Sequence, residues 1–418
     1  AHRGGPHHRD RPGGIGVTTS TVTYSPYDYE VHDDPYPTYA RLRAEAPLYR
    51  NDELGFWALS RYADVSAAFR DTARFSSAYG VTLDELAWGP DAHKTMSFLA
   101  LDPPRHTRMR ALVSRGFTPR RVQDLVPRIE ALTEQYLGPD LEAGTFDLVA
   151  DFAGKVPMDV ISELVGVPVA DRAEVRRLAD LLVHREEGVF DVPPAGIEAA
   201  LDLYAYYRDM VAERRRRPTA DLTTALVEAE IDGDGLTDAE VISFLFLLVV
   251  AGNETTTKLL ANALYWAWRN PGTAERVWAD PSLIPGWIEE TLRYDNSSQM
   301  VARRAGEAIE TPYGTIPDGD RVLLLIGSAN RDGDVFPEPD RYDIDRDTSK
   351  AIDADKLSFG VGRHYCMGAS LARLEAAIAL RALVAGCAGY DIDAAGVRRV
   401  HSVNVRGFAS VPMTVLPR

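Results

Sequence analysis

Residues 359–368 read Phe-Gly-Val-Gly-Arg-His-Tyr-Cys-Met-Gly, and they say more about this chain than any other segment. The cysteine, Cys366, lies among three glycines and just before a helical stretch that begins Ala-Ser-Leu-Ala-Arg-Leu-Glu. Glycines let a backbone adopt positive φ and approach a flat ligand closely. A thiol at a helix N-terminus lies at the positive end of the helix dipole, which favours the thiolate. The segment therefore predicts a loop that presents one thiolate to a ligand.

Several roles are open to an isolated cysteine. Most such residues are inert and buried, and some bind zinc, but no Cys-x-x-Cys or His-x-x-x-His pair supplies further zinc ligands here. A thiolate surrounded by turning backbone is also what an iron porphyrin takes as its axial ligand. The second cysteine, Cys387, lies in the apolar run Ala-Leu-Val-Ala-Gly-Cys and is interpreted as a packing residue.

The decapeptide resembles the haem-binding loop of the cytochrome P450 family, Phe-Gly-x-Gly-x-His/Arg-x-Cys-x-Gly, at every fixed position. The resemblance implies haem b with the Cys366 thiolate as axial ligand to the iron. It also implies that the conserved-pattern residues of the loop bind this cofactor; they are Phe359, Gly360, His364 and Gly368.

A second motif lies in the longest predicted helix. Thr237 and Glu240 form a capping-box signature, Asn270-Pro-Gly ends the apolar pattern, and the roughly 32 residues between them span about 50 Å at ~1.5 Å each. Inside this helix, residues 251–256 read Ala-Gly-Asn-Glu-Thr-Thr, which places polar groups in a buried-looking run. Such groups need a partner or a function.

Two features of this motif bear on a ligand. Glycine inside a helix costs roughly 1 kcal/mol relative to alanine, so Gly252 suggests room for a small molecule. The Thr255 hydroxyl can reach the carbonyl of Ala251 one turn back and loosen the helix. The run resembles the family's Ala-Gly-x-Asp/Glu-Thr oxygen-binding motif, which implies that Ala251 and Gly252 lie against the cofactor. It further implies that Thr255 hydrogen-bonds dioxygen and that Glu254 relays protons; the alternative is a solvated face of an amphipathic helix.

Four basic side chains are candidates for binding carboxylates. His106 and Arg110 lie four residues apart near a predicted helix start, a spacing that suits a carboxylate ligand. The resemblance implies that this His-x-x-x-Arg pair, with Arg303 and His364, contacts the haem propionates. Arg304, next to Arg303, is an alternative for that contact.

The pair Glu290 and Arg293 is separated by three residues and can meet on one helical face. By the resemblance, this Glu-x-x-Arg pair and Arg346 form a buried triad under the haem. The three are interpreted as structural rather than catalytic.

Composition agrees with a soluble globular protein. The 418 residues are 45% hydrophobic and 26% charged, and the net charge of −16 argues against nucleic acid or an anionic membrane as a partner. Two cysteines cannot build a disulfide framework, so we expect a reducing, cytoplasmic location. The longest apolar stretch, 241–251, is shorter than the about 20 residues of a membrane span.

The chain is predicted to be a disordered tail, residues 1–20, followed by one domain, residues 21–418. The fold class is mainly α with a small β-rich region (α+β), and the resemblance implies the triangular P450 fold with a long helix crossing the haem. Besides the long helix, helical periodicity occurs at 37–46, 62–70, 104–115, 119–137, 156–164, 170–184, 196–217 and 220–229. Strand-like runs occur at 48–59, 300–312, 322–325 and near the C-terminus.

The resemblance covers about residues 30–418 and implies a monomeric, bacterial-type haem-thiolate monooxygenase. Such an enzyme inserts one oxygen atom from O2 into a C–H bond, by hydroxylation or epoxidation, of a mostly hydrophobic small molecule of secondary metabolism. By position, segments 78–99, 181–193, 244–249, 296–301 and 401–405 are expected to face this substrate. Two alternatives are a peroxide-driven peroxygenase and a non-catalytic haem carrier or gas sensor. The acid–alcohol pair of Glu254 and Thr255 favours the monooxygenase.

Electrons are expected from a ferredoxin and its NAD(P)H-dependent reductase. Arginines expected on the cysteine side of the haem predict a positive surface that attracts an acidic ferredoxin. The alternative is that they are merely solvated or paired within the fold. They are Arg108, Arg115, Arg120, Arg121, Arg363 and Arg373.

Overall fold

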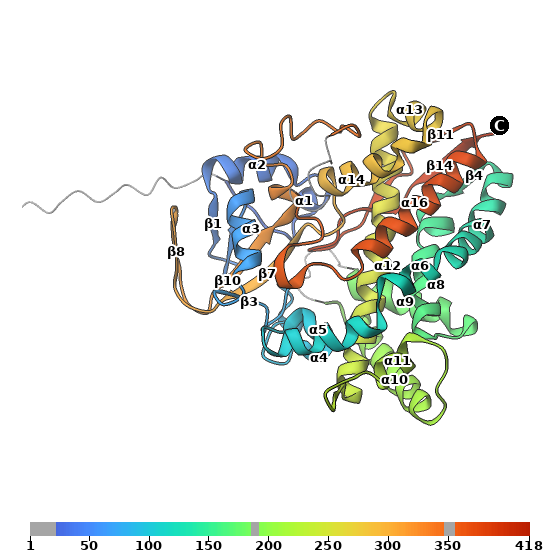
Figure 1. The fold of residues 1–418 in the computed structure, drawn as a ribbon. Coiled ribbons are helices and arrows are strands. Elements are labelled where there is room, and N and C mark those ends of the chain that lie inside the picture. Colours follow the sequence, from blue (N-terminus) through green and yellow to red (C-terminus); the bar gives the residue numbers. More distant parts are fainter. Residues whose placement is uncertain (1–21, 185–191, 347–355) are drawn as a thin grey trace, which may run out of the picture.

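The computed structural model describes residues 22–184, 192–346 and 356–418. The predicted tail, residues 1–20, and most of the 181–193 connection lie outside this description. Helices dominate the described part of the chain, as predicted (Figure 1). They are α1 Tyr29–Asp33, α2 Tyr36–Glu45, α3 Tyr62–Arg70, α4 His93–Met96, α5 Arg105–Gly116, α6 Pro119–Asp124, α7 Val126–Ala143, α8 Val156–Val165, α9 Arg172–Val183, α10 Pro194–Arg216, α11 Leu222–Val227, α12 Asp238–Arg269, α13 Thr273–Ala279, α14 Ile284–Tyr294, α15 Ile326–Ala329 and α16 Ala369–Gly386.

The strands form small sheets, the largest of which has five strands in the order β1-β2-β10-β7-β3. In this sheet β2 and β10 are parallel and the other neighbours are antiparallel. Figure 1 shows β1, β10, β7 and β3 beside α1 to α3, whereas α7, α8, α12 and α16 form the helical side of the molecule. The strands are β1 Leu48–Asn51, β2 Phe56–Leu59, β3 Phe75–Ser76, β4 Thr145–Asp147, β5 Glu230–Ile231, β6 Asp234–Gly235, β7 Met300–Ala305, β8 Ile309–Thr311, β9 Gly314–Ile316, β10 Arg321–Leu325, β11 Gly389–Ile392, β12 Arg398–Arg399, β13 Phe408–Ser410 and β14 Pro412–Leu416.

The long helix α12 has the predicted start, end and length of 32 residues. Its capping box forms, because Glu240 N–H donates to the Thr237 hydroxyl at 3.2 Å and Thr237 N–H donates to the Glu240 carboxylate at 2.9 Å. These two bonds satisfy backbone donors that a helix start leaves open.

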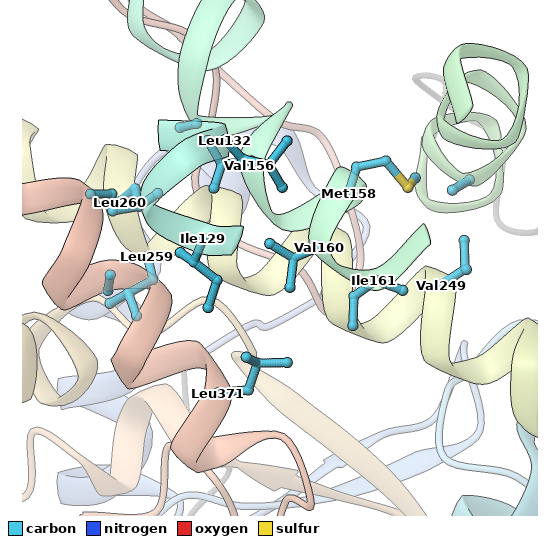
Figure 2. Packing of buried hydrophobic residues seen from close by; sticks show 14 of the residues in the cluster. Ile129, Leu132, Val156, Met158, Val160, Ile161, Val249, Leu259, Leu260 and Leu371 are labelled. Atoms are coloured by element: carbon cyan, nitrogen blue, oxygen red, sulfur yellow. The ribbon is translucent and has the colours of Figure 1, made fainter. Parts of the chain in front are cut away.

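Helix α12 is also the axis of the main hydrophobic core. Figure 2 shows Val249 of α12 near Ile161 of α8, and Leu259 of α12, Val160 of α8 and Leu371 of α16 belong to the same hydrophobic cluster. Helices α8, α10, α14 and α16 all pack against α12. By length and composition α12 could cross a membrane, but more than half of its most apolar window is buried inside the protein. We therefore interpret it as a core helix.

One predicted helix differs in the structure. The pattern at 119–137 is divided into α6 and α7 at Leu125, and Pro127 occupies the first turn of α7. Proline has no N–H to donate and is favoured in a first turn, so α7 begins there rather than continuing α6. The apolar periodicity continues through both helices, so it did not indicate that they are separate.

Candidate functional site: the cysteine loop and the central helix

The cysteine loop has the backbone that its glycines predict. Gly360 and Gly362 adopt φ of +67° and +75°. A Cβ atom would lie 3.5 Å from the Phe69 ring at Gly360 and 3.3 Å from the Phe69 carbonyl oxygen at Gly362. The Cys366 N–H donates to the Phe359 carbonyl at 2.9 Å, which closes the loop. Gly368 is the N-cap residue of α16, and its φ of −83° is one that any residue can adopt. The backbone conformation therefore does not require glycine at this position.

The Cys366 side chain is exposed. The helix dipole was predicted to lower the pKa of its thiol, but the opposite effect of desolvation is larger. Dense protein around the sulfur raises the pKa of the Cys366 thiol by desolvation. Backbone N–H groups of Gly368 and Ala369 and the charges of Arg110 and Arg373 oppose that rise only in part. A coordinated cation deprotonates a thiol outright, so the site suits a metal-bound sulfur better than a free thiolate.

The four predicted carboxylate contacts come together beside this loop. The rings of His106 and His364 lie 4.2 Å apart between centroids, and burial, followed by the charges of Arg303, His106 and Arg110, lowers the pKa of His364. Arg110 donates to the Tyr365 carbonyl at 2.7 Å. The convergence joins α5, β7 and the cysteine loop, which are distant in sequence.

These donors are buried without an anionic partner. Neither ring nitrogen of His106 nor Nδ1 of His364 has a hydrogen-bond partner among the described residues. Burial, followed by the charges of Arg110 and Arg363, lowers the pKa of His106 to about 4. Burial likewise lowers the pKa of Arg303 to about 10, and this guanidinium forms no ion pair within the described chain. Because unpaired buried donors are costly, the group fits the carboxylates of a bound cofactor.

The structure distinguishes Arg303 from Arg304. Arg303 is 2% exposed, whereas Arg304 is partly exposed, reaches Asp318 at 3.7 Å and lies over the Tyr79 ring. The two alternate across strand β7, so they point to opposite faces of the sheet. This supports Arg303 as the cofactor contact.

In α12 the Thr255 hydroxyl donates to the Ala251 carbonyl at 2.8 Å, as predicted. The Thr255 carbonyl, in turn, accepts a hydrogen bond from the Ser297 hydroxyl at 2.7 Å. Ala251 is exposed and Thr255 is partly exposed, whereas Glu254 is 5% exposed. The alternative of a solvated helical face therefore does not hold for Glu254.

The interpretation of Gly252 changes. A Cβ atom on Gly252 would lie 3.1 Å from Ile161 of α8, which is tighter than an ordinary contact. The missing side chain thus allows α8 to pack closely against α12, which is a second reason for a glycine here. A tertiary contact of this kind has no local sequence signal.

Sequence reasoning also missed the partners of Glu254. Lys258, one helical turn on, places its Nζ 3.2 Å from the Glu254 carboxylate, and both side chains are buried. Desolvation, followed by the charge of Glu254, raises the pKa of the Asp180 carboxyl group of α9. The i,i+4 spacing of Glu254 and Lys258 was visible in the sequence. The approach of Asp180 was not, because it depends on how α9 packs on α12.

The predicted triad forms. Arg293 binds Glu290 through two bonds of 2.7 and 2.8 Å, and both side chains are 2% exposed. Arg346 adds a third bond to the Glu290 carboxylate at 3.2 Å. This supports the structural role inferred for the three residues.

The predicted basic surface is smaller than expected. Arg108 pairs with Asp234 at 2.6 Å and with Glu240 at 2.8 Å, and Arg373 pairs with Glu289 at 2.6 Å. Arg108 and Arg373 are therefore paired within the fold, which was the alternative to a role in the basic surface. Three arginines remain exposed with no ion pair to a described residue; they are Arg115, Arg120 and Arg363.

Comparison with known proteins gives consistent results. A family profile described as Cytochrome P450 matches residues 282–387. A protein named putative cytochrome P450 123 from Mycobacterium tuberculosis is 56% identical over 404 residues, covering 97% of this chain and 100% of that protein. The structure of cytochrome P450 CYP109Q5 from Chondromyces apiculatus aligns with TM-score 0.84 and 35% identity, over 94% of this chain and 98% of that one. CYP109E1 from Bacillus megaterium, solved with corticosterone, aligns with TM-score 0.80 and 29% identity, over 92% and 99%.

The two cysteines provide a matched test of the axial ligand. Cys366→Ser is expected to abolish the absorbance band of thiolate-ligated haem in the reduced carbon monoxide complex, because serine supplies no thiolate. Cys387→Ser is the control, since Cys387 is buried and its Sγ donates to the Leu383 carbonyl at 3.3 Å. Difference spectra of both variants check this, and loss of the band in Cys387→Ser alone would contradict the assignment of Cys366.

Proposed function

Since the chain belongs to the cytochrome P450 family, it is a haem-thiolate monooxygenase that uses O2, and we propose that it oxidises a mostly hydrophobic small molecule of secondary metabolism. The reaction proposed is hydroxylation or epoxidation, with electrons from a ferredoxin and its NAD(P)H-dependent reductase. The observation that carries the site assignment is the convergence of His106, Arg110, Arg303 and His364 beside the Cys366 loop. We further propose that residues 21–418 act as one domain, in a cytoplasmic monomer.

Different residues of the chain would bind different parts of the cofactor. Cys366 would ligate the iron through Sγ, and the donors that lack partners would bind the propionates. Phe359, Gly360 and Gly368 would form the surface on the cysteine side, while Ala251 and Gly252 of α12 would lie on the other side. When bound, the haem supplies the redox chemistry that activates O2.

Glu254 and Thr255 have separate roles in this proposal. Thr255 would donate a hydrogen bond to dioxygen by releasing the bond that its hydroxyl now makes to Ala251. Glu254, which is buried and bound to Lys258, would accept a proton from the solvent side and hand it toward Thr255. Neither residue is required to bind substrate.

The substrate class rests on position and similarity. Among the expected substrate-facing residues at 244–249, Phe244 and Val249 are packed in the core, whereas Leu247 and Leu248 keep partial exposure. The relative CYP109E1 was solved with corticosterone, so this steroid is a suitable first probe. Binding would be seen as a shift of the Soret band. If neither corticosterone nor any member of a wider panel of hydrophobic compounds shifted the band, the proposed substrate class would be wrong.

Turnover with isotopic oxygen separates the proposed function from its alternatives. The haem-loaded enzyme with a surrogate ferredoxin, its reductase and ¹⁸O2 is expected to place one ¹⁸O atom in the product. A peroxygenase would form product only when hydrogen peroxide replaces the reductase system. A carrier or sensor would form no product with either oxidant.

Replacing the alcohol and the acid should give different defects. Thr255→Ala is expected to keep consuming NAD(P)H but to divert much of it to hydrogen peroxide, with substrate affinity nearly unchanged. Glu254→Gln is expected to slow turnover, because a general acid–base step contributes about 10²–10⁴-fold in typical enzymes. Product and peroxide yields per NAD(P)H measure both, and unchanged coupling in Thr255→Ala would remove the role assigned to its hydroxyl.

The exposed arginines Arg115, Arg120 and Arg363 support a docking surface for an acidic ferredoxin on an otherwise acidic protein. Reduction by ferredoxin is expected to slow steeply as salt rises, since exposed charges are screened over about 8 Å at physiological ionic strength. Arg120→Glu should weaken ferredoxin binding without changing substrate affinity. The control is Arg217→Glu, at the residue that follows α10, whose side chain is 83% exposed. Stopped-flow reduction measures this, and equal salt dependence in both variants would place docking elsewhere.

A further inference from the structure

A buried serine outside the central helix binds the backbone of Thr255. Ser297 lies three residues after the end of α14, in the segment 296–301, and its hydroxyl donates to the Thr255 carbonyl at 2.7 Å. The two residues are 42 positions apart in the sequence, so this bond is a tertiary contact. Ser297 is only 6% exposed, although its segment was expected to face the substrate. The side chain therefore contacts α12 rather than an open surface.

We propose that Ser297 is a positioning residue for the oxidation reaction, which fixes the backbone of α12 at Thr255 while the hydroxyl of that threonine changes its acceptor. The inference rests on the role proposed above for the Thr255 hydroxyl. Ser297 need not touch dioxygen, cofactor or substrate, because it acts through the Thr255 carbonyl. It also lies outside the motif at 251–256, which belongs wholly to α12.

The side chain and the main chain of Thr255 are restrained by different bonds. Its hydroxyl donates to the Ala251 carbonyl at 2.8 Å, a backward bond of a kind that often bends a helix. Its carbonyl has two lone pairs, and in an α-helix one of them accepts the N–H of Leu259. Ser297 supplies a second donor to this carbonyl. When the hydroxyl leaves Ala251, the bond from Ser297 to the main chain can therefore persist.

The position of Ser297 is itself determined by its neighbours. Its carbonyl accepts the Arg406 N–H at 2.7 Å, and the Arg406 guanidinium binds the fully buried Asp295 carboxylate at 2.5 Å. The Asp295 carbonyl accepts a hydrogen bond from Asn262 Nδ2 of α12 at 2.7 Å. Residues 295–297 are thus attached to α12 at two points, and also to the segment that contains Arg406. A donor held in this way can restrain the atom that it binds.

Other contacts keep α12 in place when the serine hydroxyl is removed. The Thr257 hydroxyl donates to the Ala153 carbonyl at 3.1 Å, outside α12, and the Asn262 bond to residue 295 does not involve Ser297. Loss of the Ser297 hydroxyl should therefore loosen the turn around Thr255 without detaching the helix. The expected effect is local, which makes it measurable against the rest of the core.

Hydrogen exchange tests the anchor in the haem-loaded enzyme without any turnover. Ser297→Ala is expected to accelerate amide exchange of the α12 peptide 253–262 by roughly fivefold relative to peptides of α16, which is the factor that one net hydrogen bond contributes. Mass spectrometry of the labelled peptides measures this ratio. Equal acceleration in both helices would reveal only a general loss of stability and would overturn the anchoring role.

The chain offers a matched control for the loss of a hydroxyl. Thr223 is fully buried, and its hydroxyl donates to the Val165 carbonyl at 2.6 Å, which joins α11 to α8. Thr223→Val removes a comparable bond between two elements, but not one to Thr255. This variant should leave the exchange ratio of α12 to α16 at the wild-type value.

Product and peroxide yields test the consequence for the reaction. With a surrogate ferredoxin system, Ser297→Ala is expected to divert a larger share of NAD(P)H to hydrogen peroxide at unchanged substrate affinity, because the Thr255 hydroxyl is held less precisely. Ser297→Thr, which keeps a hydroxyl, should restore the product yield, and Thr223→Val should match wild type. Weaker substrate affinity in Ser297→Ala with a normal product yield would make Ser297 a substrate contact and overturn the proposal.

The variants also separate this inference from the proposed function. If Ser297 acts only through Thr255, the double variant Ser297→Ala/Thr255→Ala should divert no more NAD(P)H to peroxide than Thr255→Ala alone. A normal product yield in Ser297→Ala, together with a low yield in Thr255→Ala, would overturn the role of Ser297 and leave that of Thr255. A normal product yield in Thr255→Ala would overturn the role of the threonine hydroxyl itself.

Discussion

The burial of cationic and imidazole donors without an anion is the constraint on which the site depends. Arg303 is 2% exposed and His106 and His364 are also buried, yet no described carboxylate pairs with them. Removing such groups from water costs several kcal/mol unless a partner is supplied. In the proposed function the cofactor's carboxylates would be that partner, and cofactor binding would then be thermodynamically linked to folding of this region. By contrast, the triad around Glu290 is satisfied within the chain and can support the fold independently.

Helix α12 both organises the hydrophobic core and accommodates a short run of polar residues. Its apolar residues pack against α8, α10 and α16 in one core, and a short polar run, residues 251–256, interrupts that apolar pattern. The polar groups are accommodated in different ways: the Thr255 hydroxyl donates to the Ala251 carbonyl of its own helix, while Glu254 forms a buried ion pair with Lys258. A threonine hydroxyl held by an internal bond can exchange it for another acceptor, whereas an acid in a buried ion pair keeps its position.

Features that depend on neighbours along the chain could be predicted from the sequence. The capping box at Thr237, the 32-residue length of α12 and the Thr255–Ala251 bond all depend on residues within one turn. The convergence of the four cofactor donors was inferred from the family resemblance. No periodicity or spacing could have provided it, because α5, β7 and the cysteine loop are brought together only by the fold.

The failures share a physical cause. Gly252 allows close packing by Ile161, and Arg108 forms an ion pair with Asp234; each contact joins separate elements. The pKa of the free Cys366 thiol depends on packing in a similar way. The helix dipole can be inferred locally, but the desolvation that outweighs it depends on the surrounding packing.

The alternation of Arg303 and Arg304 on β7 has a consequence for exchanging segments between relatives. Strand β7 pairs with β10 so that Arg303 lies opposite Val322 and Arg304 opposite Arg321. Because side chains alternate with a period of two, inserting or deleting one residue before this point would turn Arg304 inward and Arg303 outward. Both arginines would still be present, but the side chain that faces inward would be that of Arg304. Chimeric enzymes built across β7 must therefore preserve the parity of the strand as well as its sequence.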